Sequence, residues 1–184
     1  MTRIGFYHLT RWPLDQALPR LLEKALAADQ RVVVLAGSSE RVEALSDRLW
    51  TYQSDSWLPH GTARDGAAER QPIWLTADEE NPNGAAVLVA CDGVEPQRVE
   101  VYARCLDLFD GTDPEAVASA RRRWKRWKEA GHALTYYQQS EQGGWVEKAS
   151  TEAVGGVPPP APRGGGFPPN PHLFVKNWVG GVAP

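Results

Sequence analysis

The chain of 184 residues has few of the features that mark secreted, membrane or metal-binding proteins. Its two cysteines, Cys91 and Cys105, show no Cys-x-x-Cys spacing, and both fit small buried hydrophobic residues of a reducing cytosol. No apolar run approaches the roughly 18 residues that a membrane span needs. The start, residues 1–6, lacks the long apolar centre of a signal peptide. We therefore expect a cytoplasmic protein that makes no contact with a membrane.

Signatures of catalysis and of cofactor binding are also missing. The turn Ala36–Glu40 follows an apolar run but lacks both Gly-x-Gly-x-x-Gly and Gly-Lys-Ser/Thr, and Glu40 would repel a phosphate. No serine occupies a Gly-x-Ser-x-Gly elbow. None of the four histidines stands at a ligand spacing from another histidine or near a cysteine. The sequence thus predicts no cofactor, no metal and no enzymatic activity.

The first fifty residues alternate between strand and helix patterns. Arg3–Leu9 is predicted to form a strand, and apolar residues at a period near 3.6 predict a helix from Trp12 to Leu26. Pro19 within that helix indicates either a kink or a later start. Arg31–Ala36 is a β-branched run typical of a strand buried on both faces, and a second helix is expected from Ser38 to Leu49. This order favours an α/β fold with a parallel sheet.

Further short apolar runs extend that sheet beyond a loop at residues 51–70. Strands are expected at residues 72–76, 85–90, 105–109 and 133–137. We therefore predict a Rossmann-like three-layer α/β fold with a mostly parallel central sheet, occupying residues 1–148.

Composition changes sharply after Lys148. Residues 149–184 are rich in proline and glycine, which build neither a helix nor a central strand, so we predict a disordered tail. Phe167 and Trp178 are more apolar than a plain linker requires, and docking as a short linear motif is the alternative.

The run Arg121–Lys128 contains six cations and two indoles, although the whole chain carries a net charge of -3. Asp113 is a fitting N-cap, Pro114 suits the first helical turn, and Gly131 suits the end, so the run belongs to a helix. A solvated basic face is the plain interpretation. A surface that holds a negative and partly apolar ligand is the functional one.

Helical spacing divides this segment into two stripes. The stripe expected to face the core consists of Val117, Ala120, Trp124, Trp127 and Gly131. The adjacent stripe consists of Arg121, Lys125 and Lys128, with Trp124 at the border. Arg123 and Arg126 are expected to be solvated.

Together these features resemble the chi subunit family of bacterial DNA polymerase III holoenzyme. The resemblance rests on Phe6-Tyr7, on the Arg31–Ala36 strand with its acidic turn and the helix ending in Leu49-Trp50, on Ser56–His60, and on the helix Ala120–Gly131. It covers about residues 3–147. No single motif is diagnostic, whereas their order and spacing are fairly specific.

The resemblance implies a non-catalytic subunit of the clamp-loader assembly in the bacterial cytoplasm. Chi subunits bind the acidic C-terminal tail of single-stranded DNA-binding protein, which ends in a proline-phenylalanine carboxylate. They also bind a small psi subunit, so the expected partners are that tail and psi or an equivalent, with DNA contacted indirectly.

Carried over by position, the resemblance also implies site residues. Arg121 and Lys125 would face carboxylates, Trp124 and Trp57 would provide aromatic contacts, and Arg122 and Lys128 would be secondary cations. One departure from the family pattern is Asp110, in Phe109–Gly111, which would weaken an acidic ligand if it pointed inward.

Two other functions compete with this one. The same basic and aromatic helix could bind single-stranded nucleic acid directly, with its indoles stacked on bases. A nucleotide enzyme on the α/β scaffold is the weaker alternative, because the phosphate loop is missing.

Overall fold

The computed structural model describes residues 1–151. The elements in chain order are β1 (Arg3–Leu9), α1 (Leu14–Ala27), β2 (Val32–Leu35), α2 (Ser39–Thr51), β3 (His60–Gly61), η1 (Ala68–Arg70), β4 (Ile73–Thr76), β5 (Val87–Ala90), η2 (Val99–Val101), β6 (Arg104–Asp110), α3 (Pro114–Glu129), β7 (Ala133–Gln139) and β8 (Trp145–Ser150).

The strands form one sheet in the order β3-β4-β2-β5-β6-β1-β7-β8. All neighbours are parallel except β7 and β8, which form an antiparallel hairpin at one edge. β1 lies between β6 and β7, with Phe6 opposite both Asp107 and Tyr136. The predicted α/β fold with a mostly parallel sheet is confirmed.

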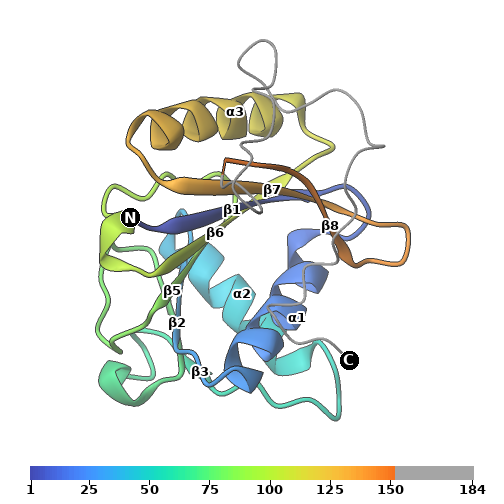
Figure 1. The fold of residues 1–184 in the computed structure, drawn as a ribbon. Helices are drawn as coiled ribbons and strands as arrows, with labels where there is room; N and C mark the ends of the chain where they lie inside the picture. Colours follow the sequence, from blue (N-terminus) through green and yellow to red (C-terminus); the bar gives the residue numbers. More distant parts are fainter. Residues whose placement is uncertain (152–184) are drawn as a thin grey trace.

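Helices cover both faces of the sheet, so the molecule has three layers. In Figure 1, α1 and α2 lie on one face and α3 crosses the other, above β1 and β7. Strands with helices on both faces have few polar positions, and β2 accordingly reads Val-Val-Val-Leu with every residue buried.

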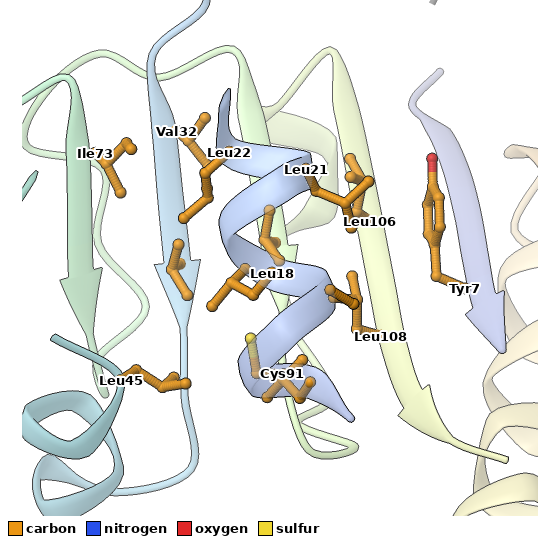
Figure 2. Close-up of a cluster of buried hydrophobic side chains, with 14 of the residues drawn as sticks. Tyr7, Leu18, Leu21, Leu22, Val32, Leu45, Ile73, Cys91, Leu106 and Leu108 are labelled. Atoms are coloured by element: carbon orange, nitrogen blue, oxygen red, sulfur yellow. The ribbon is translucent and has the colours of Figure 1, made fainter. Parts of the chain in front are cut away.

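Leucines of α1 and α2 form the core on the first face. Figure 2 shows Leu22 of α1 beside Val32 of β2, and Leu21 of α1 beside Leu106 of β6. Aromatic residues dominate the second face, where Phe6 meets Trp124 and Trp127 of α3 at ring-centroid distances of 5.2 and 5.6 Å. The α3 helix is thus held by large rings rather than by aliphatic side chains.

The predicted elements are confirmed, with two refinements. Pro19 lies inside α1, which begins at Leu14, so the helix does not start later. β8 is a strand that the sequence analysis missed, and it continues past the expected domain end to Ser150. The predicted disorder of the tail lies outside the described residues, apart from residues 149–151, which belong to β8 and its end.

Candidate functional site

The helix α3 begins and ends at the residues that the sequence predicts as its cap and its terminator. Asp113 accepts a hydrogen bond from the backbone N–H of Glu115 at 2.9 Å, and Pro114 occupies the first turn. Gly131 adopts a φ of +83°, a conformation that favours glycine, just beyond the helix. The cations of the last turns lie at the negative end of the helix dipole, which stabilises them there.

The inner face of α3 holds the expected apolar stripe. Ala120, Trp124 and Trp127 are buried against the sheet, and Val117 is half-buried. Trp124 is only 7% exposed and its ring packs edge-on against Phe6. It therefore supports the helix from below and presents little of its indole to a ligand, less than the border position in the sequence led us to expect.

Arg123 is buried, and the prediction that it is solvated was wrong. Its guanidinium is 1% exposed and donates through Nε and Nη2 to both oxygens of Asp107, at 2.6 and 2.8 Å. A third donor, Nη1, reaches the hydroxyl of Ser119 at 2.9 Å. Burial raises the pKa of Asp107, and the Arg123 guanidinium opposes this. Bidentate pairing is the arrangement that makes a buried charge tolerable.

Arg121, Lys125 and Lys128 follow one another along one exposed flank of α3, next to Val117. The charge of Arg121 acts on His8 of β1 and on Tyr136 of β7, which places this flank above those two strands. These three cations thus lie on the side of α3 that is nearer the β7–β8 hairpin, next to the surface of the sheet.

The β7–β8 hairpin presents small apolar side chains together with Tyr136 and Gln138 on the face that α3 covers. Tyr136 pairs with Ala149 and Gln138 with Val146 in the antiparallel hairpin, so these four side chains share the face that α3 covers. Ala149 packs against the core of that face and Val146 is half-buried. We call Val117, Val146 and Ala149 the apolar shelf. Val117 lies one helical turn before Arg121 on α3, which brings this part of the shelf beside the cations.

A small polar cluster lies beneath Arg121. His8 Nδ1 is 2.5 Å from the Tyr136 hydroxyl, and the His8 ring stacks on Phe109 at a centroid distance of 5.0 Å. Burial lowers the pKa of His8, and Arg121 acts in the same direction. Burial likewise raises the pKa of Tyr136 to about 12. The cluster is therefore neutral at physiological pH, and it does not compete with a ligand for the charge of Arg121.

Three exposed cations of α3 have acidic neighbours, and one of them, Lys125, belongs to the flank described above. Arg126 pairs with Glu95 on the opposite flank, above the loop between β5 and β6. Arg122 pairs with Glu115 at 3.1 Å, and Lys125 approaches Glu129 at 3.9 Å, in both cases between exposed side chains. Such exposed pairs contribute about 0–1 kcal/mol each, so a ligand can displace them readily.

Asp110 does not point toward the shelf. Its carboxylate accepts hydrogen bonds from the amide and hydroxyl of Thr112, at 2.8 and 2.7 Å, and these bonds lower its pKa. The acid therefore stabilises the turn between β6 and α3. The departure from the family pattern leaves the cationic flank without an inward-facing carboxylate at this position.

Trp57 lies on the other side of the molecule, so the structure does not bring it together with Arg121. Its loop follows α2, and the adjacent Ser56 donates to Glu23 of α1 at 2.5 Å. Leu58 belongs to the core that α1 and α2 cover. The structure therefore does not bring Trp57 and Trp124 together, because the sheet separates their layers.

His60 anchors the same loop, as expected of a structural histidine. Nδ1 donates to the carbonyl of Leu58 at 2.7 Å, which leaves Nε2 to accept from the hydroxyl of Ser46 at 3.1 Å. Both ring nitrogens are thus occupied in fixing the loop that carries Trp57, which is itself 75% exposed.

Within residues 1–151, no group of three or more His, Cys, Asp or Glu side chains is arranged to hold a metal ion. Over the same residues, no helix is both long and apolar enough to span a membrane. The arrangement on α3 is suited to holding an anionic ligand through cations beside an apolar surface.

Comparison with known proteins agrees with this arrangement. The family model of the DNA polymerase III chi subunit, HolC, matches residues 1–135. The chain belongs to this family. A probable DNA polymerase III subunit chi of Rickettsia prowazekii is 35% identical over 109 residues, which is 59% of this chain and 66% of that protein. The subunit chi of Pseudomonas aeruginosa is 26% identical over 137 residues, which is 73% of this chain and 94% of that protein.

Membership of the chi family makes the chain an accessory subunit of the DNA polymerase III complex in DNA replication, without catalytic activity of its own. The match to the family model ends at residue 135, in the middle of β7. β8, which carries two of the three residues of the apolar shelf, therefore lies beyond the matched residues.

Proposed function

We propose that this chi subunit binds the acidic C-terminal tail of single-stranded DNA-binding protein on the flank of α3. The observation that carries the proposal is the placement of Arg121, Lys125 and Lys128 along one exposed flank beside an apolar shelf, in a chain with a net charge of -3. A ligand with carboxylates and an aromatic end is complementary to both parts of this surface.

Each part of the surface has a separate role. Arg121 offers a planar guanidinium that can grip a carboxylate with two hydrogen bonds, and Lys125 and Lys128 add point charges for further acids. The shelf of Val117, Val146 and Ala149 takes the phenyl ring of the last residue. Arg122 lies farther from the shelf, next to Glu115, and contributes through its long-range charge.

A second partner would occupy the opposite side of the molecule. Trp50 is 59% exposed and Trp57 is 75% exposed, and both lie near the β3 edge of the sheet, away from α3. Exposed indoles are enriched at protein interfaces. We assign this surface to psi or an equivalent subunit, which would connect the chain to the clamp loader while the α3 flank stays accessible to the tail.

Direct binding of single-stranded DNA is the alternative that the experiment must distinguish from binding of the acidic tail. Base stacking requires exposed rings, whereas Trp124 and Trp127 are 7% and 3% exposed. The cations of α3 alone would give only a salt-sensitive attraction to phosphates.

The proposal is tested by titrating the protein with a labelled acidic peptide that ends in Asp-Ile-Pro-Phe. We expect a dissociation constant on the order of micromolar, because a few anchors must offset the ordering of a short peptide. Amidation of the peptide C-terminus removes the carboxylate that Arg121 grips, so we expect binding to weaken at least about tenfold.

Equal affinity for the free and the amidated peptide would contradict recognition of a terminal carboxylate. Absence of peptide binding together with binding of an oligothymidine, lost steeply between low and moderate salt, would replace the proposal with the nucleic-acid alternative.

A further inference from the structure

A hollow lies between α1 and the turn that joins β7 to β8, on the face of the sheet opposite α3. Its volume is about 270 Å³, and Trp12, Arg20, Lys24, Gln139 and Trp145 are among the residues that line it. This volume is just below the range of roughly 300–1,000 Å³ that is usual for sites of drug-sized molecules, so it suits one or two amino-acid side chains.

The lining of this hollow is positively charged. Arg20 and Lys24 stand four residues apart on α1, both exposed, and no carboxylate belongs to the lining. Two other hollows of residues 1–151 differ in this respect, because one is lined by Asp78, Glu79 and Glu80, and another by Asp15, Asp92 and Asp110. In an acidic protein, a hollow with cations and no acids is selective for an anion.

Gln139 provides the second observation. Its Oε1 accepts hydrogen bonds from three successive backbone amides, those of Thr10, Arg11 and Trp12, at 2.9–3.0 Å. Only an oxygen can accept from these donors, so the orientation of the amide is fixed and Nε2 faces away from them. The residue is only 7% exposed, and among residues 1–151 its buried Nε2 has no hydrogen-bond partner. A buried donor without an acceptor costs free energy that a ligand oxygen would recover.

Two indoles supply the apolar part of the lining. Trp145 is buried at the start of β8, and the guanidinium of Arg20 lies 3.8 Å from the ring centroid of Trp12. Gly143 has a φ of +79°, and a Cβ there would come within 2.1 Å of the Trp12 ring. The glycine thus lets the turn pack directly onto Trp12, which fixes that wall of the hollow.

We propose that this hollow binds a carboxylate that adjoins an apolar side chain, presented by a short acidic segment of a partner protein. The carboxylate would accept from Gln139 Nε2 and attract Arg20 and Lys24, and the apolar side chain would lie against the indoles. The site is separate from α3, because the sheet lies between them, and it stands whether or not α3 binds the tail of single-stranded DNA-binding protein.

The test is a titration of the ¹⁵N-labelled full-length protein. The chemical shifts of the Gln139 side-chain amide and of the indole N–H groups of Trp12 and Trp145 report binding. One probe is acetyl-Gly-Asp-Leu-Asp-Gly-amide, whose only carboxylates are side chains. The other is acetyl-Gly-Gly-Leu with a free C-terminal carboxylate. The control peptide is acetyl-Gly-Asn-Leu-Asn-Gly-amide. We expect saturable shifts of the Gln139 amide with one or both acidic probes and none with the control, and the responding probe identifies the source of the carboxylate.

Variants locate the binding in the hollow. Arg20→Gln combined with Lys24→Gln is expected to weaken the responding probe at least about tenfold. Arg48→Gln, which removes an exposed cation from the last turn of α2, is expected to change the affinity less than about twofold. Gln139→Glu keeps an oxygen for the three amides but replaces the donor with an acceptor, and it is expected to abolish binding.

Arg121→Gln separates the two sites, because it is expected to leave the Gln139 shifts unchanged. The proposal is overturned if the Gln139 amide responds to neither acidic probe, or if the Arg20→Gln and Lys24→Gln double variant binds as the unmodified protein does. The double variant changes only exposed side chains, so its result decides the matter even if Gln139→Glu does not fold.

Discussion

Arg123 and Asp107 form a buried ion pair that connects α3 to β6 at the middle of the sheet. Both side chains are almost completely inaccessible, at 1% and 0% exposure, and their two hydrogen bonds are 2.8 Å or shorter. Such a pair contributes little net stability against apolar replacements, but it is costly to break, because the remaining charge stays buried. The pair therefore determines the position of the helix whose outer flank carries the proposed site.

We predict that Arg123→Ala lowers the free energy of unfolding by about 3–5 kcal/mol, since it leaves Asp107 unpaired in the interior. Arg126→Ala is the matched control, because its pair with Glu95 is largely exposed, and the expected loss is about 0–1 kcal/mol. Urea unfolding of both variants measures the difference. Similar losses in the two would show that the buried pair does not hold α3 in place.

We predict that His8 makes the free energy of unfolding depend on pH. Its pKa is lowered in the folded protein by burial and by Arg121, whereas Gly111 and Asp110 act in the opposite direction. The unfolded chain, with a histidine pKa near 6.5, then binds a proton more readily than the folded protein does. Above the pKa of the unfolded state, the neutral His8 costs no stability. As the pH falls below that pKa, the unfolded chain takes up the proton more readily, and the free energy of unfolding decreases.

The measurement compares denaturation midpoints of the protein and of His8→Gln between pH 7.5 and 5. The other histidines titrate in both proteins, so the difference between the two profiles isolates His8. We expect the unmodified protein to lose more stability than the variant over this range. Parallel profiles would show that the folded state does not disfavour protonation of His8.

Among the elements, the turn from β6 into α3 packs closely against β1. A Cβ on Gly111 would lie 2.0 Å from the His8 ring and 2.7 Å from the carbonyl oxygen of Leu9. We predict that Gly111→Ala destabilises the protein by about 1–3 kcal/mol, because the turn must move away from β1. Gly37→Ala is the control, since its Cβ would meet only Val94, at an ordinary 3.6 Å. Thermal unfolding of both variants is the check, and equal midpoints would contradict this packing.

The elements that could be predicted from the sequence are those with a strong local pattern. β2 is a continuous β-branched run, and α3 has a cap, a first-turn proline and a terminal glycine, so local chemistry defines both. β8 was missed because its sequence, Trp-Val-Glu-Lys-Ala-Ser, has only a short apolar part, and pairing with β7 makes it a strand.

Arg123 and Trp57 lie elsewhere than the sequence indicates, for a similar reason. Arg123 was expected to be solvated because arginine is usually exposed, although it adjoins the buried stripe of α3 and Asp107 is the one acid between apolar residues of β6. That lone acid was the signal of a buried partner. The resemblance groups Trp57 with the α3 residues, and no local sequence pattern tells which face of a sheet a loop joins.

For the molecule as a whole, the sheet separates two proposed interaction surfaces, the one for the acidic tail and the one for psi or an equivalent subunit. The α3 flank carries cations on one face, whereas the loop with Trp57 adjoins α1 on the other face, where Ser56 donates to Glu23. We predict that Trp57→Ala changes the affinity for the acidic tail peptide less than about twofold. The same variant should weaken binding of psi or the equivalent subunit at least about tenfold, because exposed tryptophans are frequent anchors of interfaces.

Pull-down of the partner and fluorescence titration of the tail peptide, made on the same preparation of Trp57→Ala, separate these effects. A variant that loses the peptide but keeps the partner would reverse the assignment of the two faces.

The central claim is that the flank of α3 with Arg121, rather than its overall positive charge, recognises the acidic tail. The most direct measurement is the affinity of Arg121→Gln and of Arg126→Gln for the peptide ending in Asp-Ile-Pro-Phe, at one ionic strength. Both variants remove one cation from the same helix, on opposite flanks. We predict that Arg121→Gln weakens binding by about 1–3 kcal/mol, whereas Arg126→Gln changes it by less than about 0.5 kcal/mol. Equal losses in the two variants would contradict the claim, because they would reduce the site to a diffuse attraction between charges.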